Sequence, residues 1–235
     1  MIRTVIFDVD DTLYSFHRAN EAAVNALVIY TKEHFGWDKD EFLDRQKLAM
    51  ADIRRYAGTS GGYRSRILRY QNMLEAAGQR IYPHAQTMSS IYQHTLLENM
   101  IPEPGAEKWM RSLKDNGIRV GIGSDATAQQ QFLKLEKLGF LPLIDFMVTS
   151  EEAGAEKPDP RFFARCHEKC ACQKKEVMFI GDNFDKDYTG AKEFGYNAVW
   201  YDPQGKKGHK PDFELHHFDD APVLLNILNR EEYEE

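Results

Sequence analysis

Short apolar runs that do not alternate with polar residues recur along the chain and predict β-strands that are buried on both faces. Six such runs are present, the last of them weak: Thr4–Asp8, Arg119–Ser124, Phe146–Ser150, Val177–Asp182, Ala198–Tyr201 and Phe213–Leu215. From residue 105 onward, candidate helices alternate with the strands: Gly105–Asn116, Thr127–Leu138, Pro160–Lys169 and Tyr188–Phe194. This alternation is typical of an α/β fold, and we predict a doubly wound parallel sheet covered by helices on both faces.

Residues from about 15 to 85 follow a different pattern, because strand-like runs are absent and the first proline of the chain is Pro83. Apolar residues at helical spacing form one stripe that ends before Gly36: Ala19, Ala22, Ala23, Ala26, Leu27 and Tyr30. Three further helices are predicted over Asp38–Tyr56, Tyr63–Ala77 and Ala85–Glu98. We therefore predict two domains, an α/β core of residues 1–14 and 101–235 and a helical domain of residues 15–100.

The composition and charge exclude several classes of protein. Of the 235 residues 42% are hydrophobic and 29% are charged, which allows a sizeable core. No apolar run approaches the ~20 residues of a membrane helix, and Asp8 interrupts the start of the chain before a signal peptide is complete. A net charge of −7 disfavours a nucleic-acid polymer as partner. We expect a cytoplasmic monomer or homodimer that binds neither membrane nor nucleic acid and holds a small phosphorylated metabolite through local basic groups.

Three cysteines lie close together in the sequence, at Cys166, Cys170 and Cys172. An odd number of cysteines in a chain too large to need disulfides indicates reduced thiols. With His167 they suggest a metal site, but the spacing lacks the paired C-x-x-C pattern of structural zinc. We interpret them as ordinary thiols near the end of a helix, and a role in redox control stays open.

Acidic residues follow three of the predicted strands, at the ends where ligands bind to an open parallel sheet. They are Asp8, Asp10 and Asp11 after the first strand, Asp125 after the second, and Asp182, Asp185 and Asp187 after the fourth. Carboxylates that converge on one place repel one another unless a cation lies among them, and ligand sets rich in carboxylate oxygens suit Mg²⁺. The sequence therefore predicts a Mg²⁺ site at this edge of the sheet.

Such a site can support phosphoryl transfer, because a carboxylate beside Mg²⁺ can attack a bound phosphoryl group and form an aspartyl-phosphate. Asp10, two residues beyond Asp8, can protonate the leaving oxygen and later deprotonate water. Lys157 can neutralise the nucleophile and the phosphoryl oxygens, and Ser124 can donate its hydroxyl to a non-bridging oxygen. These residue types point to the hydrolysis or transfer of a phosphate ester.

Four segments together resemble the motifs of the haloacid dehalogenase superfamily of phosphohydrolases. They are Asp8-x-Asp10-x-Thr12, Ser124 after an apolar strand, Lys157 before Pro158, and Gly181-Asp182-x4-Asp187. The resemblance implies that Asp8 is the nucleophile, Asp10 the general acid and base, and Ser124 and Lys157 the phosphate-binding residues. It also implies that Mg²⁺ is held by Asp8, the Asp10 carbonyl, Asp182 and Asp187, on a Rossmann-like core whose helical insert is an alpha-helical cap.

Two positions refine what the resemblance implies. Asp125, which we count among the substrate-binding residues, stands where many members carry Asn, and its role is open. Asp10 has no acidic counterpart in the dehalogenases themselves and favours phosphate ester hydrolysis. A cap excludes water and selects the substrate, and an arginine there can clamp a distal phosphate or carboxylate. Candidate specificity residues are Tyr14, Arg54, Arg55, Tyr63, Arg64 and Arg66, of which we favour Tyr14 and Arg64.

We predict a Mg²⁺-dependent phosphatase that hydrolyses a small phosphate monoester, either a nucleoside monophosphate or a sugar phosphate, through an aspartyl-phosphate. The sequence of the first motif, from Asp8 to Tyr14, favours a nucleoside monophosphate, but only by analogy with members of the family. Alternatives are a phosphomutase of the same superfamily, a non-catalytic phosphate-binding module, and a phosphoacceptor signalling domain. The intact set of Asp8, Asp10, Lys157 and Asp182 argues against the binding module. In a signalling domain Asp10 and the helical insert have no clear purpose.

Overall fold

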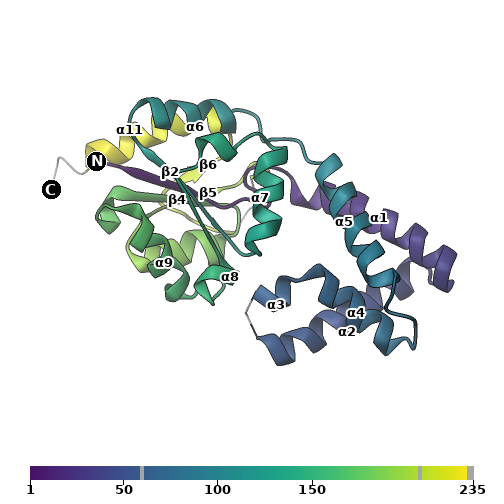
Figure 1. Cartoon of the computed structure of the whole chain (residues 1–235). Helices are drawn as coiled ribbons and strands as arrows, with labels where there is room; N and C mark the ends of the chain where they lie inside the picture. Colours follow the sequence, from purple (N-terminus) through teal and green to yellow (C-terminus); the bar gives the residue numbers. More distant parts are fainter. Residues whose placement is uncertain (59–60, 206–207, 232–235) are drawn as a thin grey trace. The chain divides into compact units, whose positions relative to one another are not determined.

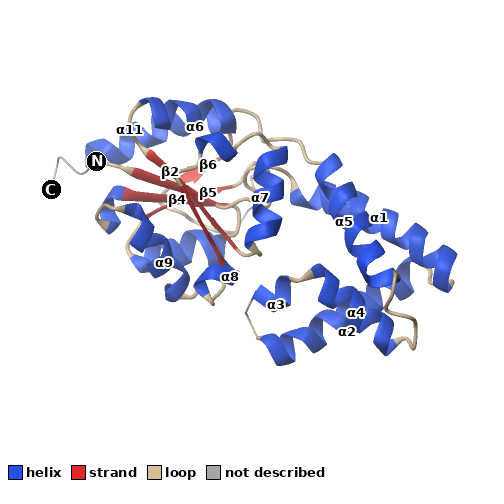
Figure 2. Ribbon diagram, viewed as in Figure 1, coloured by secondary structure: helices blue, strands red, loops and turns tan. Residues whose placement is uncertain are grey.

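The computed structural model describes residues 1–58, 61–205 and 208–231. The chain divides into two compact units, one made of Met1–Ser15 with Ile101–Glu235 and the other of Phe16–Met100 (Figure 1). The described strands all belong to the first unit, whereas the described elements of the second are helices (Figure 2). The predicted α/β fold is confirmed. Within the described ranges no helix is both long and apolar enough to cross a membrane.

The first unit is built on one parallel sheet with the strand order β3-β2-β1-β4-β5-β6. The strands are β1 (Thr4–Phe7), β2 (Arg119–Ser124), β3 (Phe146–Thr149), β4 (Val177–Gly181), β5 (Asn197–Tyr201) and β6 (Glu214–Leu215). Phe7, the last residue of β1, lies opposite Ile122 of β2 and Ile180 of β4. Because the strands are parallel, the residues that follow β1, β2 and β4 meet at one edge of the sheet.

Helices cover both faces of this sheet. They are α6 (Ala106–Asp115), α7 (Ala128–Lys137), α8 (Ser150–Ala153), α9 (Pro160–Cys170), α10 (Gly190–Phe194) and α11 (Ala221–Glu231). Shorter helical segments are η1 (Leu141–Leu143), η2 (Lys174–Glu176), η3 (Phe184–Thr189) and η4 (Phe218–Asp220). Helices α6 and α11 lie on one face, whereas α8 and α9 lie on the other (Figure 1).

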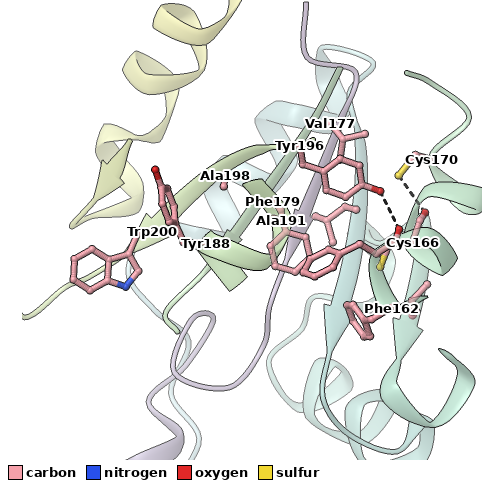
Figure 3. Packing of buried hydrophobic residues seen from close by; sticks show 13 residues of the cluster. Phe162, Cys166, Cys170, Val177, Phe179, Tyr188, Ala191, Tyr196, Ala198 and Trp200 are labelled. Carbon is pink, nitrogen blue, oxygen red and sulfur yellow. Dashed lines mark hydrogen bonds between the residues drawn. The ribbon is translucent and has the colours of Figure 1, made fainter. Parts of the chain in front are cut away.

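Neighbouring residues of β1 pack into different layers, because successive side chains of a strand point to opposite faces. The Phe7 ring centroid is 5.3 Å from that of Trp109 in α6 and 6.2 Å from that of Phe218 in η4. Ile6 instead joins a buried cluster with Phe162 and Cys166 of α9. Figure 3 shows part of this cluster, with side chains from α9 and β4 packed together. The sheet that carries the acidic residues is thus held by apolar contacts from both sides.

The second unit consists of packed helices. They are α1 (Phe16–Phe35), α2 (Lys39–Ala57), α3 (Gly61–Arg64), α4 (Arg66–Ala76) and α5 (His84–Glu98). The predicted apolar stripe of α1 is buried at Ala19, Ala23 and Leu27. The helix expected over Tyr63–Ala77 is divided at Ser65, whose hydroxyl accepts a hydrogen bond from the Leu68 backbone N–H at 3.4 Å. Ser65 therefore caps α4 and separates it from α3.

The helical segment after β4 begins earlier than the predicted start at Tyr188. Its first six residues form the π-helical segment η3, and the side chain of Asn183 caps it by accepting a hydrogen bond from Lys186 N–H at 3.0 Å. A π-helix does not follow the period of 3.6 residues on which the sequence prediction relies. The prediction also missed α11, and it assigned Ser150 to a strand although this residue begins α8.

Candidate active site

Asp8 lies directly after β1, at the edge of the sheet where the acidic residues meet. Its backbone N–H donates to the Ile180 carbonyl at 2.8 Å, which fixes Asp8 next to β4. Its side chain is buried, and Oδ1 accepts a hydrogen bond from Lys157 Nζ at 2.7 Å. Burial raises the pKa of Asp8 well above its usual value, while the positive charge of Lys157 opposes this rise. The charged form of Asp8 therefore depends on nearby cations.

Lys157 is the cation that joins the carboxylates of the site. It is 4% exposed, and its Nζ lies 2.6 Å from Oδ1 of Asp187 and donates to the Gly123 carbonyl at 3.1 Å. Burial by itself lowers the pKa of Lys157, but the charges of Asp187 and Asp8 outweigh it and raise this pKa above its usual value. Lys157 is therefore protonated at neutral pH and places a fixed positive charge beside Asp8.

Three carboxylates form a group that can hold a metal ion. Asp8, Asp182 and Asp187 each offer an oxygen, and these oxygens lie within 4.8 Å of one another. The backbone of Asp182 is fixed on two sides, since its N–H donates to Thr12 Oγ1 at 3.1 Å and its carbonyl accepts from Trp200 Nε1 at 2.8 Å. Three carboxylates facing one lysine leave an excess of negative charge, and an all-oxygen donor set fits a hard divalent cation such as Mg²⁺.

Gly181 allows Asp187 to reach this group. A Cβ atom at Gly181 would lie 2.4 Å from Cγ of Asp187, which is closer than non-bonded atoms approach. The Oδ2 atom of Asp187 accepts a hydrogen bond from the Asn183 backbone N–H at 3.0 Å. The end of β4 and the π-helical segment η3 therefore fold around the Asp187 carboxylate, and the absence of a side chain at Gly181 is what gives it room.

Asp10 is held by donors on two elements. Tyr14 Oη donates to its Oδ1 at 2.5 Å, and Lys134 Nζ of α7 donates to Oδ1 and Oδ2 at 2.6 and 2.8 Å. These contacts fix the orientation of a carboxylate whose side chain is 29% exposed. Tyr14 is fully buried and belongs to the first unit, so it does not lie with the arginines of the helical insert among which the sequence analysis counted it as a specificity residue.

Ser124 and Asp125 lie side by side after β2 but make different contacts. Ser124 Oγ is buried and accepts a hydrogen bond from Gln131 Nε2 at 2.7 Å, which directs its own hydroxyl hydrogen to another acceptor. Asp125 Oδ1 accepts from the backbone N–H of Lys157 at 3.0 Å, and its Oδ2 accepts from Lys186 Nζ at 2.8 Å. The contacts of Ser124 suit a donor to phosphate, whereas those of Asp125 hold Lys157 in place.

Gln131 and Lys134 are functional candidates that the sequence analysis missed. They lie three residues apart on one face of α7, and both are buried. Leu135 and Leu138 share this face and are buried as well. A long polar side chain within the apolar stripe of an amphipathic helix is the signal that could have identified them, because burial of such a group requires a partner.

The arginines singled out in the helical insert lie in the second unit. Arg54 and Arg64 place their guanidinium carbons 5.3 and 5.4 Å from the Tyr63 ring centroid. The guanidinium carbon of Arg66 lies 4.1 Å from the Tyr92 ring centroid. Arg55 is exposed and forms an ion pair with Asp52 at 2.7 Å. Among these arginines, Arg55 makes the contacts that are usual for an exposed residue on a solvated helix face.

The three cysteines carry free thiols, of which Cys166 and Cys170 are buried. Cys170 Sγ donates to the Cys166 carbonyl at 3.2 Å (Figure 3). Burial raises the pKa of the Cys170 thiol to about 12 and raises that of Cys166 as well. Within the described part of the chain, the groups of possible metal ligands contain none of the three cysteines. The buried pair therefore contributes to the core as neutral thiols.

Comparisons of the sequence and of the structure with known proteins agree on one family. A model of haloacid dehalogenase-like hydrolases matches residues 2–195. Ribulose-1,5-bisphosphate 5-phosphatase of Halopiger xanaduensis is 28% identical, with 86% of each chain covered. Glyceraldehyde 3-phosphate phosphatase of Methanopyrus kandleri is 29% identical, with 94% of this chain and 91% of the relative covered. The solved structure of 2-haloacid dehalogenase from Pseudomonas syringae pv. tomato has a TM-score of 0.77 at 23% identity, covers 96% of this chain with 99% of its own, and shows a shared fold.

Proposed function

The chain belongs to the haloacid dehalogenase-like hydrolases, and from this premise we propose that it is a Mg²⁺-dependent phosphatase of a small phosphorylated metabolite. The observation that carries the proposal is the position of Lys157 Nζ, 2.7 Å from Asp8 and 2.6 Å from Asp187. A buried cation beside a carboxylate nucleophile is suited to a substrate that brings further negative charge. The curated relatives at 28% and 29% identity are both named as phosphatases.

In the proposed reaction an Asp8 oxygen forms a bond to phosphorus while the bond from phosphorus to the ester oxygen breaks. Asp10 gives a proton to the leaving oxygen. Asp10 then takes a proton from water, whose oxygen attacks the phosphorus of the aspartyl-phosphate and releases inorganic phosphate. Lys157 and the Ser124 hydroxyl hold the phosphoryl oxygens throughout. Asp8 leaves the cycle as the carboxylate with which it began.

The metal requirement follows from the donor set. Asp8, Asp182 and Asp187 would hold Mg²⁺, together with the Asp10 carbonyl that the motif resemblance implies. When bound, Mg²⁺ neutralises charge on the phosphoryl oxygens and on the attacking carboxylate. Lys157 supplies one positive charge permanently, and the metal supplies the two that the three carboxylates still lack. We therefore expect turnover to require a divalent cation.

Asp10 distinguishes ester hydrolysis from carbon–halogen cleavage. The structural relative named as a 2-haloacid dehalogenase shares the fold at 23% identity, which carries no argument about chemistry. A halide needs no proton to leave, whereas an alkoxide does. The two hydrogen-bond donors that fix Asp10, Tyr14 and Lys134, keep this carboxyl group in one orientation. This arrangement supports a reaction in which the leaving oxygen is protonated.

For the substrate we propose a sugar phosphate ahead of a nucleoside monophosphate. The names of the two relatives at 28% and 29% identity refer to phosphorylated sugars of three and five carbons. The nucleoside monophosphate favoured by the sequence of the first motif remains the second substrate class to be tested. Both classes are small phosphate monoesters and require the same residues around the phosphoryl group.

The test is phosphate release from sugar phosphates, nucleoside monophosphates and p-nitrophenyl phosphate, with Mg²⁺ or with EDTA. We expect release with Mg²⁺ and none with EDTA. Replacement Asp8→Asn should reduce kcat by at least about 10³-fold, because the amide is a poor nucleophile. The control is Asp185→Asn, which removes an exposed acid of η3, the segment that follows β4 at the same edge of the sheet. Turnover by Asp8→Asn above a tenth of the parent, or transfer to a second hydroxyl without net phosphate release, would contradict the proposal.

A further inference from the structure

Arg69 of α4 is buried without an acidic partner among the residues that the structure describes. Arg69 is 5% exposed, and its Nε has no hydrogen-bond partner within the described ranges. Two other arginines of the helical unit are paired, since Arg45 lies 2.7 Å from Glu41 and Arg55 lies 2.7 Å from Asp52. Burial of an unpaired guanidinium is costly, because the lost hydration is not replaced. Such a group calls for an explanation.

Tyr70, the next residue, has the same property. It is fully buried, and its hydroxyl oxygen has no hydrogen-bond partner in the described structure. Two orphaned polar atoms on consecutive residues of one helix, an N–H donor and a hydroxyl, leave hydrogen-bonding capacity unused in the interior of the helical unit. Both groups can donate to the oxygen of an anion.

A second arginine adds positive charge to this place. Arg66 lies one helical turn before Arg69, and its guanidinium carbon is 4.1 Å from the Tyr92 ring centroid. Burial, followed by the charge of Arg66, lowers the pKa of Arg69 to about 10. Arg66 and Arg69 are therefore close enough to repel each other, and no described carboxylate forms an ion pair with either. An anion placed between them would remove this repulsion.

We propose that Arg66, Arg69 and Tyr70 form an anion-binding site in the helical unit, for a phosphate or carboxylate group of a small metabolite. Guanidinium groups bind these planar or tetrahedral oxyanions through paired N–H donors. The source of the anion is either a second anionic group of the substrate, an assignment that rests on the proposed function, or a separate metabolite. The same chemistry recognises both, and the experiment distinguishes them.

The first arm measures binding of inorganic phosphate to the full chain in EDTA, by calorimetry and by the rise in melting temperature. Arg69→Met should lose one bound phosphate per chain, and Tyr70→Phe should weaken that site several-fold. The control Arg45→Met should bind phosphate as the parent does. Without phosphate, Arg69→Met should melt at or above the temperature of the parent, because it removes an unpaired buried charge. A structural role for Arg69 predicts a lower melting temperature.

The second arm compares steady-state kinetics on ribulose 1,5-bisphosphate, which carries two phosphates, and on p-nitrophenyl phosphate, which carries one. If the substrate supplies the anion, Arg69→Met raises the KM for the bisphosphate at least tenfold more than the KM for the aryl phosphate. If a separate metabolite supplies the anion, Arg69→Met changes the two KM values by the same factor. The variant still binds one phosphate fewer than the parent in the first arm.

If the parent and Arg69→Met bind phosphate with equal stoichiometry and affinity, the proposed anion-binding site is wrong. A folded parent without any phosphatase activity would overturn the proposed function instead, and the phosphate titration would still decide whether the site exists.

Discussion

Asp10 takes its orientation from residues outside the sequence motifs. Lys134 reaches both of its carboxylate oxygens from α7, and Tyr14 reaches one of them from the end of the same loop. Lys134 is itself buried, so its charge is compensated chiefly by the residues it faces. We infer that Lys134 is a positioning residue, which acts on the substrate through Asp10.

Replacement Lys134→Met should therefore slow the hydrolysis of alkyl phosphates by about 10- to 100-fold in kcat, which is less than the ~10²–10⁴-fold of complete general acid–base catalysis because Asp10 itself is kept. The rate of p-nitrophenol release in the first turnover with p-nitrophenyl phosphate should change much less, because this step needs no proton from Asp10. The control is Lys137→Met, which alters an exposed lysine of the same helix. Equal losses in the first-turnover rates of both substrates would show that Lys134 supports the fold and not the orientation of Asp10.

At the scale of elements, the passage from β4 into η3 determines the position of Asp187. A Cβ atom at Gly181 would overlap the Asp187 carboxylate, so Gly181→Ala must displace it. We expect this variant to need about 10- to 100-fold more Mg²⁺ for half-maximal activity, as for residues that orient metal ligands. Its circular dichroism should match the parent, and excess Mg²⁺ should restore much of the rate. An unchanged Mg²⁺ requirement would contradict the placement of Asp187 at the metal.

Helix α9 carries two thiols whose chemical behaviour follows from its packing. Burial raises the pKa of Cys170 to about 12 and also raises that of Cys166, so both stay protonated at pH 8 and lack the reactive thiolate. Iodoacetamide applied to the folded protein at pH 8 should modify Cys172, which is half-buried, well before the other two. Mass spectrometry of peptides measures this order, and modification of Cys166 as fast as Cys172 would contradict it.

The elements that the sequence predicted well are those whose patterns are local. Strand β2 has the expected bounds, because its two polar end residues, Arg119 and Ser124, enclose a short run without polar side chains. The π-helical segment η3 escaped prediction because its hydrogen bonds depart from the period of an α-helix. The division at Ser65 was missed because the polar residue that caps α4 is also tolerated inside a helix. Local patterns therefore predicted the strands of the sheet more reliably than the boundaries of the helices.

At the scale of the whole molecule, the distribution of charge matters more than its sum. A net charge of −7 repels phosphorylated metabolites at long range. The positive groups that offset it are concentrated, with Lys134, Lys157 and Lys186 at the acidic edge of the sheet and Arg66 with Arg69 in the helical unit. Attraction of the substrate to the acidic edge therefore depends on a bound cation together with these lysines, and it should weaken as ionic strength rises.

The same scale explains which site residues the sequence alone could suggest. Motifs suggested Asp8, Ser124, Lys157 and Asp182 as candidates, because strand ends that are distant in sequence meet at one edge of a parallel sheet. The partners that orient them, such as Gln131 for Ser124, are defined by contacts across the fold and by no local pattern. Arg69 could not be recognised in advance, because its distinctive property is the absence of a partner within the described structure, which only a folded chain reveals.

The central claim is that the Asp8 carboxylate accepts the phosphoryl group. The most direct measurement is to mix Asp10→Asn with Mg²⁺ and p-nitrophenyl phosphate, quench in acid, and analyse peptides generated at low pH by mass spectrometry. The good leaving group allows the first step without Asp10, and the loss of the base slows the second, so the intermediate accumulates. We predict one burst of p-nitrophenol per active site and a phosphoryl group on Asp8. A burst without that modification, or a phosphoryl group on another residue, would contradict the account.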